Sequence, residues 1–210
     1  MWSVVLLVAA AFDLGCLVYL LRSPGSDSMR TAVLVVVGLG LAYDAAVFGS
    51  GTLVGEGAAL HAASIGRFLG HAVCTPLLLL WAADALPGRP VRRCWAAVAA
   101  GALVVWGLAD LSGLRLVPKH FADTLRYSAE SPSGPPIPAL LVTAALLVVG
   151  LSRWRAGDGP WLTAGVLALV LASGAAIACP PLGNLGESIL LAALVTHGAA
   201  GLLRYVIMSR

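Results

Sequence analysis

Seven long apolar runs, separated by short breaks rich in proline and glycine, limit what this chain of 210 residues can fold into more than any other feature. The runs lie at about residues 2–21, 31–48, 60–86, 95–111, 137–151, 161–177 and 186–208. About 20 apolar residues in a helix cross a hydrocarbon core of about 30 Å, and lipid excludes irregular backbone because its polar groups would stay unpaired. We therefore predict an all-α membrane protein, a bundle of seven transmembrane helices that forms one domain over residues 1–210.

The composition and the distribution of charge fit this interpretation. Apolar residues make up 60% of the chain and charged residues 11%, against about 25% charged residues in a soluble domain. The net charge of +3 comes from small basic clusters between the runs, which argues against a nucleic-acid partner. One side of the predicted bundle carries Arg22, Arg30, Arg89, Arg92, Arg93, Arg153, Arg155, Arg204 and Arg210. The other side has Arg115, Lys119 and Arg126, so the positive-inside rule places the N-terminus outside and the C-terminus inside a cell membrane.

The connections between the runs are short, with one exception. Breaks are expected at residues 23–26, 49–51, 87–90, 132–136, 157–160 and 180–183. In the longer connection between the fourth and fifth runs, Val117, Phe121 and Leu125 recur at every fourth residue, which predicts a short interfacial helix. The first run contains Asp13 and has no basic residue ahead of it, so we expect a retained helix and not a cleaved signal.

The third run carries a family resemblance. It contains Arg67 followed by an aromatic residue and then, from Thr75, the order Thr-Pro-Leu-Leu-Leu-Leu, and it resembles the third helix of the microbial rhodopsins. Residues 43–51 are similar to the end of the second helix in that family, and residues 14–21 to its first helix. The resemblance implies a rhodopsin-like seven-helix bundle.

The resemblance to microbial rhodopsins also shows that this chain lacks residues that a retinal-binding member of that family needs. His197 falls at the position of the lysine that holds retinal in that family, and Lys119, in the outer connection, is the only lysine in the chain. A Schiff base needs an amine, so covalently bound retinal is excluded. Gly70, Trp81 and Ala193 stand where the resemblance implies the carboxylates of the proton route. The chain is therefore not expected to be a light-driven pump.

Two buried histidines suggest a different cofactor. The third and seventh runs both enter from the outer side, near Leu60 and Gly186, which puts His71 about 16 Å and His197 about 17 Å deep. In rhodopsin-like bundles these helices face each other across the cofactor cavity. Imidazoles are common axial ligands of haem iron, so His71 and His197 predict non-covalent haem b, with both as metal ligands. Electron transfer or haem-based sensing, with a redox or signalling partner, would follow.

Neighbouring residues complete the predicted site. Small side chains near both histidines would leave room for a flat ligand, and Arg67, one turn outward from His71, could bond a propionate or pair with Glu56 or Glu187. Cys74 and Thr75 lie beside the helix proline. The predicted cofactor-binding residues are His71, His197, Arg67, Gly70, Cys74, Thr75, Ala193 and Gly201.

Other interpretations stay open. The chain could be a cofactor-free scaffold or signalling protein, alone or as a homo-oligomer, or it could bind retinal or a carotenoid without a covalent bond. Asp13 and Asp44 are expected to be hydrogen-bonded in the bundle, in preference to forming a proton path. His61 and His120, expected at the outer surface, could join Glu56 or Glu187 in a second metal site. The sequence contains no Walker loop, nucleophile elbow or HExxH motif, so enzyme activity has no support.

Overall fold

A computed structural model describes residues 1–23, 28–86, 90–131 and 136–208, with side chains described up to His197 in the last helix. Within these ranges the chain forms seven helices and one two-stranded hairpin, so the structure is mostly helical and fits the predicted all-α membrane bundle, with the hairpin as a departure from it. The elements are α1 (Trp2–Arg22), α2 (Ser28–Val54), α3 (Ala58–Ala85), α4 (Pro90–Asp110), β1 (Leu116–Phe121), β2 (Thr124–Ala129), α5 (Ile137–Arg155), α6 (Trp161–Ala175) and α7 (Pro181–Met208). The predicted breaks at 23–26, 87–90 and 132–136 lie wholly or partly outside the described residues.

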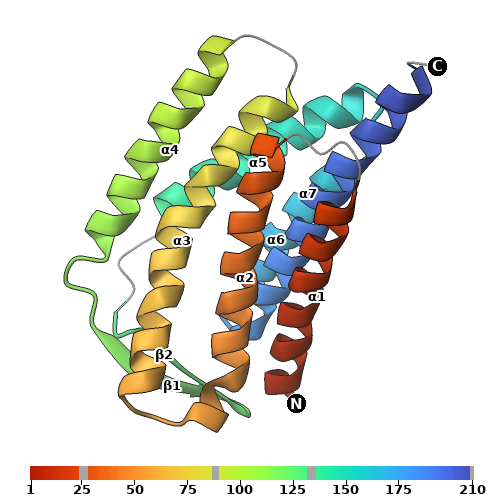
Figure 1. Cartoon of the computed structure of the whole chain (residues 1–210). Helices are drawn as coiled ribbons and strands as arrows, with labels where there is room; N and C mark the ends of the chain where they lie inside the picture. The colour runs from red at the N-terminus through yellow and green to blue at the C-terminus, as the bar shows by residue number, and fades with distance from the viewer. Residues whose placement is uncertain (24–27, 87–89, 132–135, 209–210) are drawn as a thin grey trace.

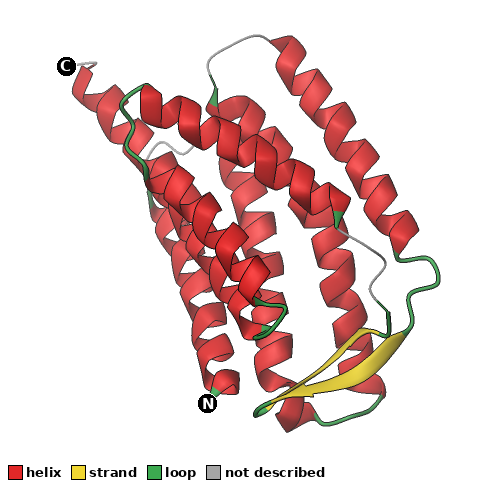
Figure 2. Cartoon of the chain, turned by 180° about the vertical axis from the view of Figure 1, so that it is seen from behind, coloured by secondary structure: helices red, strands yellow, loops and turns green. Residues whose placement is uncertain are grey.

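The helices pack mostly beside their neighbours in the chain (Figure 1). In addition, α7 packs against α1 and α2, and α3 packs against α5, which closes the bundle. Helix α5 crosses the bundle obliquely, and the hairpin covers one end of it (Figure 2). The N-terminus lies at the hairpin end and the C-terminus at the opposite end.

The surface of the bundle suits a bilayer. Helices α1 to α5 are each long and apolar enough to cross a membrane, and α6 is a shorter apolar helix of 15 residues. Large apolar side chains point outward along α4, including Val91, Val98 and Val105. Trp154 and Trp161 are exposed close to the arginine-rich end of α5, where interfacial tryptophans are expected. The chain is therefore a membrane protein.

The predicted interfacial helix between the fourth and fifth runs is wrong, because this segment forms the antiparallel strands β1 and β2. Pro118 lacks the N–H that a helix interior requires, and the β-branched and aromatic residues around it favour a strand. A spacing of four, seen in Val117, Phe121 and Leu125, also satisfies the two-residue period of a strand. Ala122 turns the chain between the strands with a φ of 48°.

Asp123 ties the hairpin to the first helix. Its carboxylate accepts hydrogen bonds from the backbone N–H groups of Trp2 at 2.7 Å and Ser3 at 3.2 Å, and it also pairs with the N-terminal ammonium group. The carbonyl oxygen of Asp123 accepts the hydroxyls of Ser3 at 2.6 Å and Thr52 at 3.2 Å. The hairpin thus caps α1 and holds it beside α2.

The predicted break at residues 49–51 is also wrong, because α2 continues through it to Val54. The helix stops where Gly55 adopts a φ of 78°, a conformation that favours glycine. Gly51 instead permits a close approach, since a Cβ atom there would lie 1.7 Å from the carbonyl oxygen of Leu125 in β2. Leu125 in turn packs with Leu60 of α3 beneath the hairpin.

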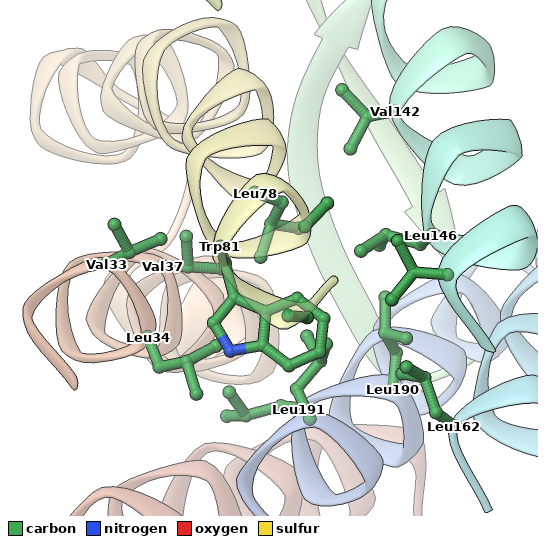
Figure 3. Close-up of a cluster of buried hydrophobic side chains, with 14 of the residues drawn as sticks. Val33, Leu34, Val37, Leu78, Trp81, Val142, Leu146, Leu162, Leu190 and Leu191 are labelled. Atoms are coloured by element: carbon green, nitrogen blue, oxygen red, sulfur yellow. The ribbon is translucent and has the colours of Figure 1, made fainter. Parts of the chain in front are cut away.

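Trp81 of α3 occupies the middle of the main apolar core (Figure 3). Its side chain is among the largest that are fully buried, and the surrounding leucines and valines come from α2, α5, α6 and α7. Large side chains from most of the helices thus fill this region around the indole ring.

Candidate functional site

A buried ion pair joins α2 to α3. The guanidinium of Arg67 binds the carboxylate of Asp44 in a bidentate manner, with Nε 2.6 Å from Oδ1 and Nη2 3.0 Å from Oδ2. The side-chain amide of Asn184 in α7 donates a further hydrogen bond to Oδ2. Asp44 is 3% exposed and Arg67 8% exposed. Bidentate pairs of this kind fix geometry as well as charge, so Asp44 has one defined orientation.

His71 lies one turn along α3 from Arg67, on the same face of the helix. Its Nε2 is 3.6 Å from Oδ1 of Asp44, and its Nδ1 is 3.9 Å from Oε1 of Glu187 in α7. Both distances exceed those of a normal hydrogen bond. The imidazole therefore stands between two carboxylates without being tightly bonded to either.

The three side chains form a candidate metal site. One ligand atom from each of Asp44, His71 and Glu187 lies within 4.8 Å of the others, and among the described residues they are the only such group of three. They come from α2, α3 and α7, so the helix packing brings them together. An imidazole nitrogen and carboxylate oxygens are ligands that Zn²⁺ accepts.

Two small cavities adjoin members of this group, one beside His71 and one beside Glu187. Gly70, His71, Cys74 and Thr75 line a cavity of about 20 Å³ together with Gly40 of α2. A second cavity, of about 50 Å³, is lined by Glu187, the two threonines Thr75 and Thr143, and leucines of α2, α3, α5, α6 and α7. The side chain of His71 is 42% exposed and that of Glu187 24% exposed. Each cavity is large enough for a water molecule, which occupies about 10–15 Å³ in such measures.

Further polar groups flank the cluster on both sides. Asp13 of α1 and Ser188 of α7 are both buried, and the Oδ1 of the first and the Oγ of the second have no hydrogen-bond partner among the described residues. Toward the hairpin, the guanidiniums of Arg67 and Arg126 both lie over the ring of Phe48, 5.2 Å and 4.5 Å from its centre. Burial, and secondarily the charge of Arg67, lowers the pKa of Arg126 to about 10, so it keeps its charge at neutral pH.

The second predicted haem ligand lies elsewhere. The ring of His197 packs edge-on against Trp81, with 5.9 Å between the ring centres. His197 is ten residues beyond Glu187 along α7, and Trp81 is ten residues beyond His71 along α3, so the two histidines differ in depth by about 15 Å. Leucines of the main core separate the two levels. The prediction that His71 and His197 share one depth is therefore wrong.

The error has a physical origin in where the two helices begin. Leu60 of α3 lies beneath the hairpin, against Leu125. The seventh helix starts at Pro181 and not near Gly186, because proline is well tolerated in the first turn of a helix. The residues that face each other across α3 and α7 are consequently His71 and Glu187.

These positions do not fit a haem held by two histidines. The larger cavity beside the cluster measures about 50 Å³, against roughly 300–1,000 Å³ for pockets that hold cofactors. Ala193 packs against Gly165 of α6, and a Cβ at that glycine would lie 2.5 Å from the Ala193 methyl. Gly201 lies in the part of α7 whose side-chain surroundings are outside the described residues. The predicted site residues of α3 thus line one region, while His197 and Ala193 lie apart from it.

The structure also tests the predicted partners of Arg67, Asp44 and the histidines near the hairpin. Arg67 pairs with Asp44 and not with either glutamate, and the expectation that Asp44 is hydrogen-bonded is confirmed. At the hairpin end of the bundle His120 contacts Glu56 at 3.1 Å, while His61 packs on the ring of Tyr127 at 5.0 Å, so the two histidines do not share a site.

The prediction from the sequence did not include Asn184, nor the position of Glu187 beside His71. A signal for them exists in the sequence, because Asn184, Glu187 and Ser188 follow the spacing that places polar residues on one face of a helix.

No protein-family model matches the sequence, and no curated protein matches it. The functional interpretation therefore depends on the side chains of the cluster.

Proposed function

We propose that the chain is a seven-helix cell-membrane protein of the microbial rhodopsin type that holds no covalent retinal and binds a small cation inside the bundle, at Asp44, His71 and Glu187. The residue order of α3 from Arg67 to Pro76 supports the family, and the single lysine in the hairpin argues against a Schiff base. The arginines at the end opposite the hairpin support an N-terminus outside and a C-terminus inside.

The balance of charge around His71 carries this proposal. Three carboxyl groups, those of Asp13, Asp44 and Glu187, meet two guanidiniums, of which only Arg67 bonds a member of the group directly. With a neutral imidazole and ionised carboxyls, the group has one more negative than positive charge, and either a proton on His71 or a bound cation would balance it. Buried charges are stabilised by pairing or by coordination of an ion, and ionisable groups inside a membrane bundle usually serve function.

Thermal unfolding of the detergent-purified protein, at one pH and one ionic strength, tests cation binding. Chlorides of Na⁺, K⁺, Mg²⁺, Ca²⁺, Mn²⁺, Co²⁺ and Zn²⁺ would be compared. A cation present at 100 times its Kd should stabilise the folded state by about 2.7 kcal/mol. We expect the stabilisation in the wild type and in His197→Ala, but not in Glu187→Gln. If no cation stabilises the wild type more than Glu187→Gln, the proposal is wrong and a cofactor-free scaffold becomes the better interpretation.

The absorption spectrum of the same preparation checks the haem prediction. A Soret band that disappears in both His71→Ala and His197→Ala would restore the bis-histidine haem, which the separation of the two rings argues against. A broad visible band without a Soret band would point to a non-covalent polyene.

A further inference from the structure

We infer that the cation is a divalent first-row transition-metal ion of the zinc type, held by one nitrogen of His71 and one oxygen each of Asp44 and Glu187, with a fourth position open to the adjacent cavity. This inference rests on the proposed cation site and names its ligand class.

The donor set selects the class of metal. Calcium takes six to eight oxygen ligands, and magnesium requires an octahedral set of oxygens, so neither matches three protein ligands that include an imidazole. Zinc and its neighbours accept nitrogen and oxygen donors together, commonly with three protein ligands and one open position when the site is not purely structural. Asp44, His71 and Glu187 offer that number and that mixture.

The separations are close to what a tetrahedral site needs. Metal–ligand distances of about 2.0–2.2 Å place neighbouring ligand atoms of a tetrahedral site about 3.3–3.6 Å apart. The contacts of His71 are 3.6 Å to Asp44 and 3.9 Å to Glu187, through different ring nitrogens. A rotation of the ring is needed to direct one nitrogen between both carboxylates. His71 has room for it, because its side chain is half-exposed at the cavity beside Gly70.

Asp44 is held as a metal ligand would be. A carboxylate has about four acceptor positions, and Arg67 and Asn184 occupy three of them at Asp44. One position is left for an ion. Hydrogen bonds of this kind orient metal ligands, and their removal commonly weakens binding about 10- to 100-fold. The guanidinium also repels a cation, so we expect a site from which the metal can exchange.

Open space lies beside His71, one of the three proposed ligands. The cavity lined by Gly70, His71, Cys74 and Thr75 measures about 20 Å³, enough for one water molecule as the remaining ligand. Asp13, whose Oδ1 has no hydrogen-bond partner among the described residues, lies in the same charged group and adds negative potential. An exchangeable ligand and a net negative surrounding both favour reversible metal binding.

Titration with Co²⁺ tests the inference, because cobalt in a tetrahedral site with nitrogen and oxygen ligands absorbs visible light. We expect saturation near one Co²⁺ per wild-type chain and displacement of the band by Zn²⁺. His71→Ala and Glu187→Gln should weaken binding at least about 100-fold, and Asn184→Ala should weaken it about 10-fold or more. His197→Ala is the matched control, since it removes a histidine of the same bundle that lies by Trp81, and it should bind as the wild type does.

The possible failures are distinct. If Na⁺ or Ca²⁺ stabilises the protein through Glu187 while Co²⁺ and Zn²⁺ do not bind, the metal class is wrong and the cation site stands. If no cation binds, both proposals fall. Cobalt binding that persists in His71→Ala and Glu187→Gln, but is lost in His120→Ala, would assign the ion to the outer surface and overturn the inference. Glu187→Gln keeps the side-chain shape, so the test does not depend on the folding of His71→Ala.

Discussion

Replacement of Arg67 by methionine removes the guanidinium but keeps an apolar side chain, and it should destabilise the protein by about 3–5 kcal/mol. The carboxylate of Asp44 is 3% exposed and would lose hydrogen bonds of 2.6 and 3.0 Å. Asn184 would remain as its only hydrogen-bond donor among the described side chains. The expected loss is large because a buried charge that has lost its counter-ion is strongly destabilising. The intact pair, by contrast, adds little stability compared with apolar side chains in its place.

The double variant Arg67→Met with Asp44→Leu separates the two effects. Because it removes both charges together, it should recover the loss and be more stable than Arg67→Met alone by about 3 kcal/mol or more. Unfolding in mixed micelles of increasing denaturing detergent, followed by tryptophan fluorescence, measures both free energies. If Arg67→Met loses less than about 1 kcal/mol, or if the double variant loses the sum of the single losses, the two residues are not a coupled buried pair.

Three further predictions concern the hairpin and the core. Gly51→Ala should destabilise the protein by more than about 1 kcal/mol, since its Cβ would lie 1.7 Å from a hairpin carbonyl, whereas Gly101→Ala, with open space around it, should be neutral or stabilising in the same unfolding assay. The N-terminal ammonium and the first N–H groups of α1 hold the pKa of Asp123 below its usual value, so this contact stabilises the fold above pH of about 3.9 and weakens as the pH falls further. Asp123→Asn should show less of this acid sensitivity in hydrogen exchange at the start of α1, and identical acid profiles would contradict the assignment. Trp81→Ala should cost about 3–5 kcal/mol, while Trp161→Ala, which is 72% exposed, should change the unfolding free energy by less than about 0.5 kcal/mol.

The positions of the helices follow from the sequence because the bilayer imposes a strict requirement for apolar length. The first run was expected at 2–21 and forms Trp2–Arg22, and the fifth was expected from residue 137 and begins at Ile137. The ends are harder to predict. Gly51 lies inside a helix because the hairpin needs a glycine at a close contact, and proline begins α7 in place of ending the segment before it.

The connection after α4 shows a second limit of sequence patterns. A spacing of four residues is common to one face of a helix and one face of a strand, so periodicity alone did not separate them at Val117, Phe121 and Leu125. Pro118 was the better indicator, because it removes a backbone donor.

The candidate site could be predicted from the sequence only in part, for a related reason. Arg67 and His71 could be recognised as buried polar residues on one face of α3, and Asp44 as a carboxylate with a bonding partner. The apolar pattern of a helix gives the direction in which a side chain points, but not how far one helix is shifted along its axis against another. That shift decides whether His71 meets Glu187 or His197, and the hairpin that packs on α2 and α3 was not predicted from the sequence.

The bond between Asp123 and the start of α1 also bears on how the chain is assembled. The backbone donors at residues 2 and 3 find their acceptor in a segment made after four helices have been synthesised. Until the hairpin has been synthesised, these two N–H groups therefore lack the carboxylate that accepts them in the folded protein. Ribosome-bound fragments that end before β1 should leave that end open to exchange, and longer fragments should protect it.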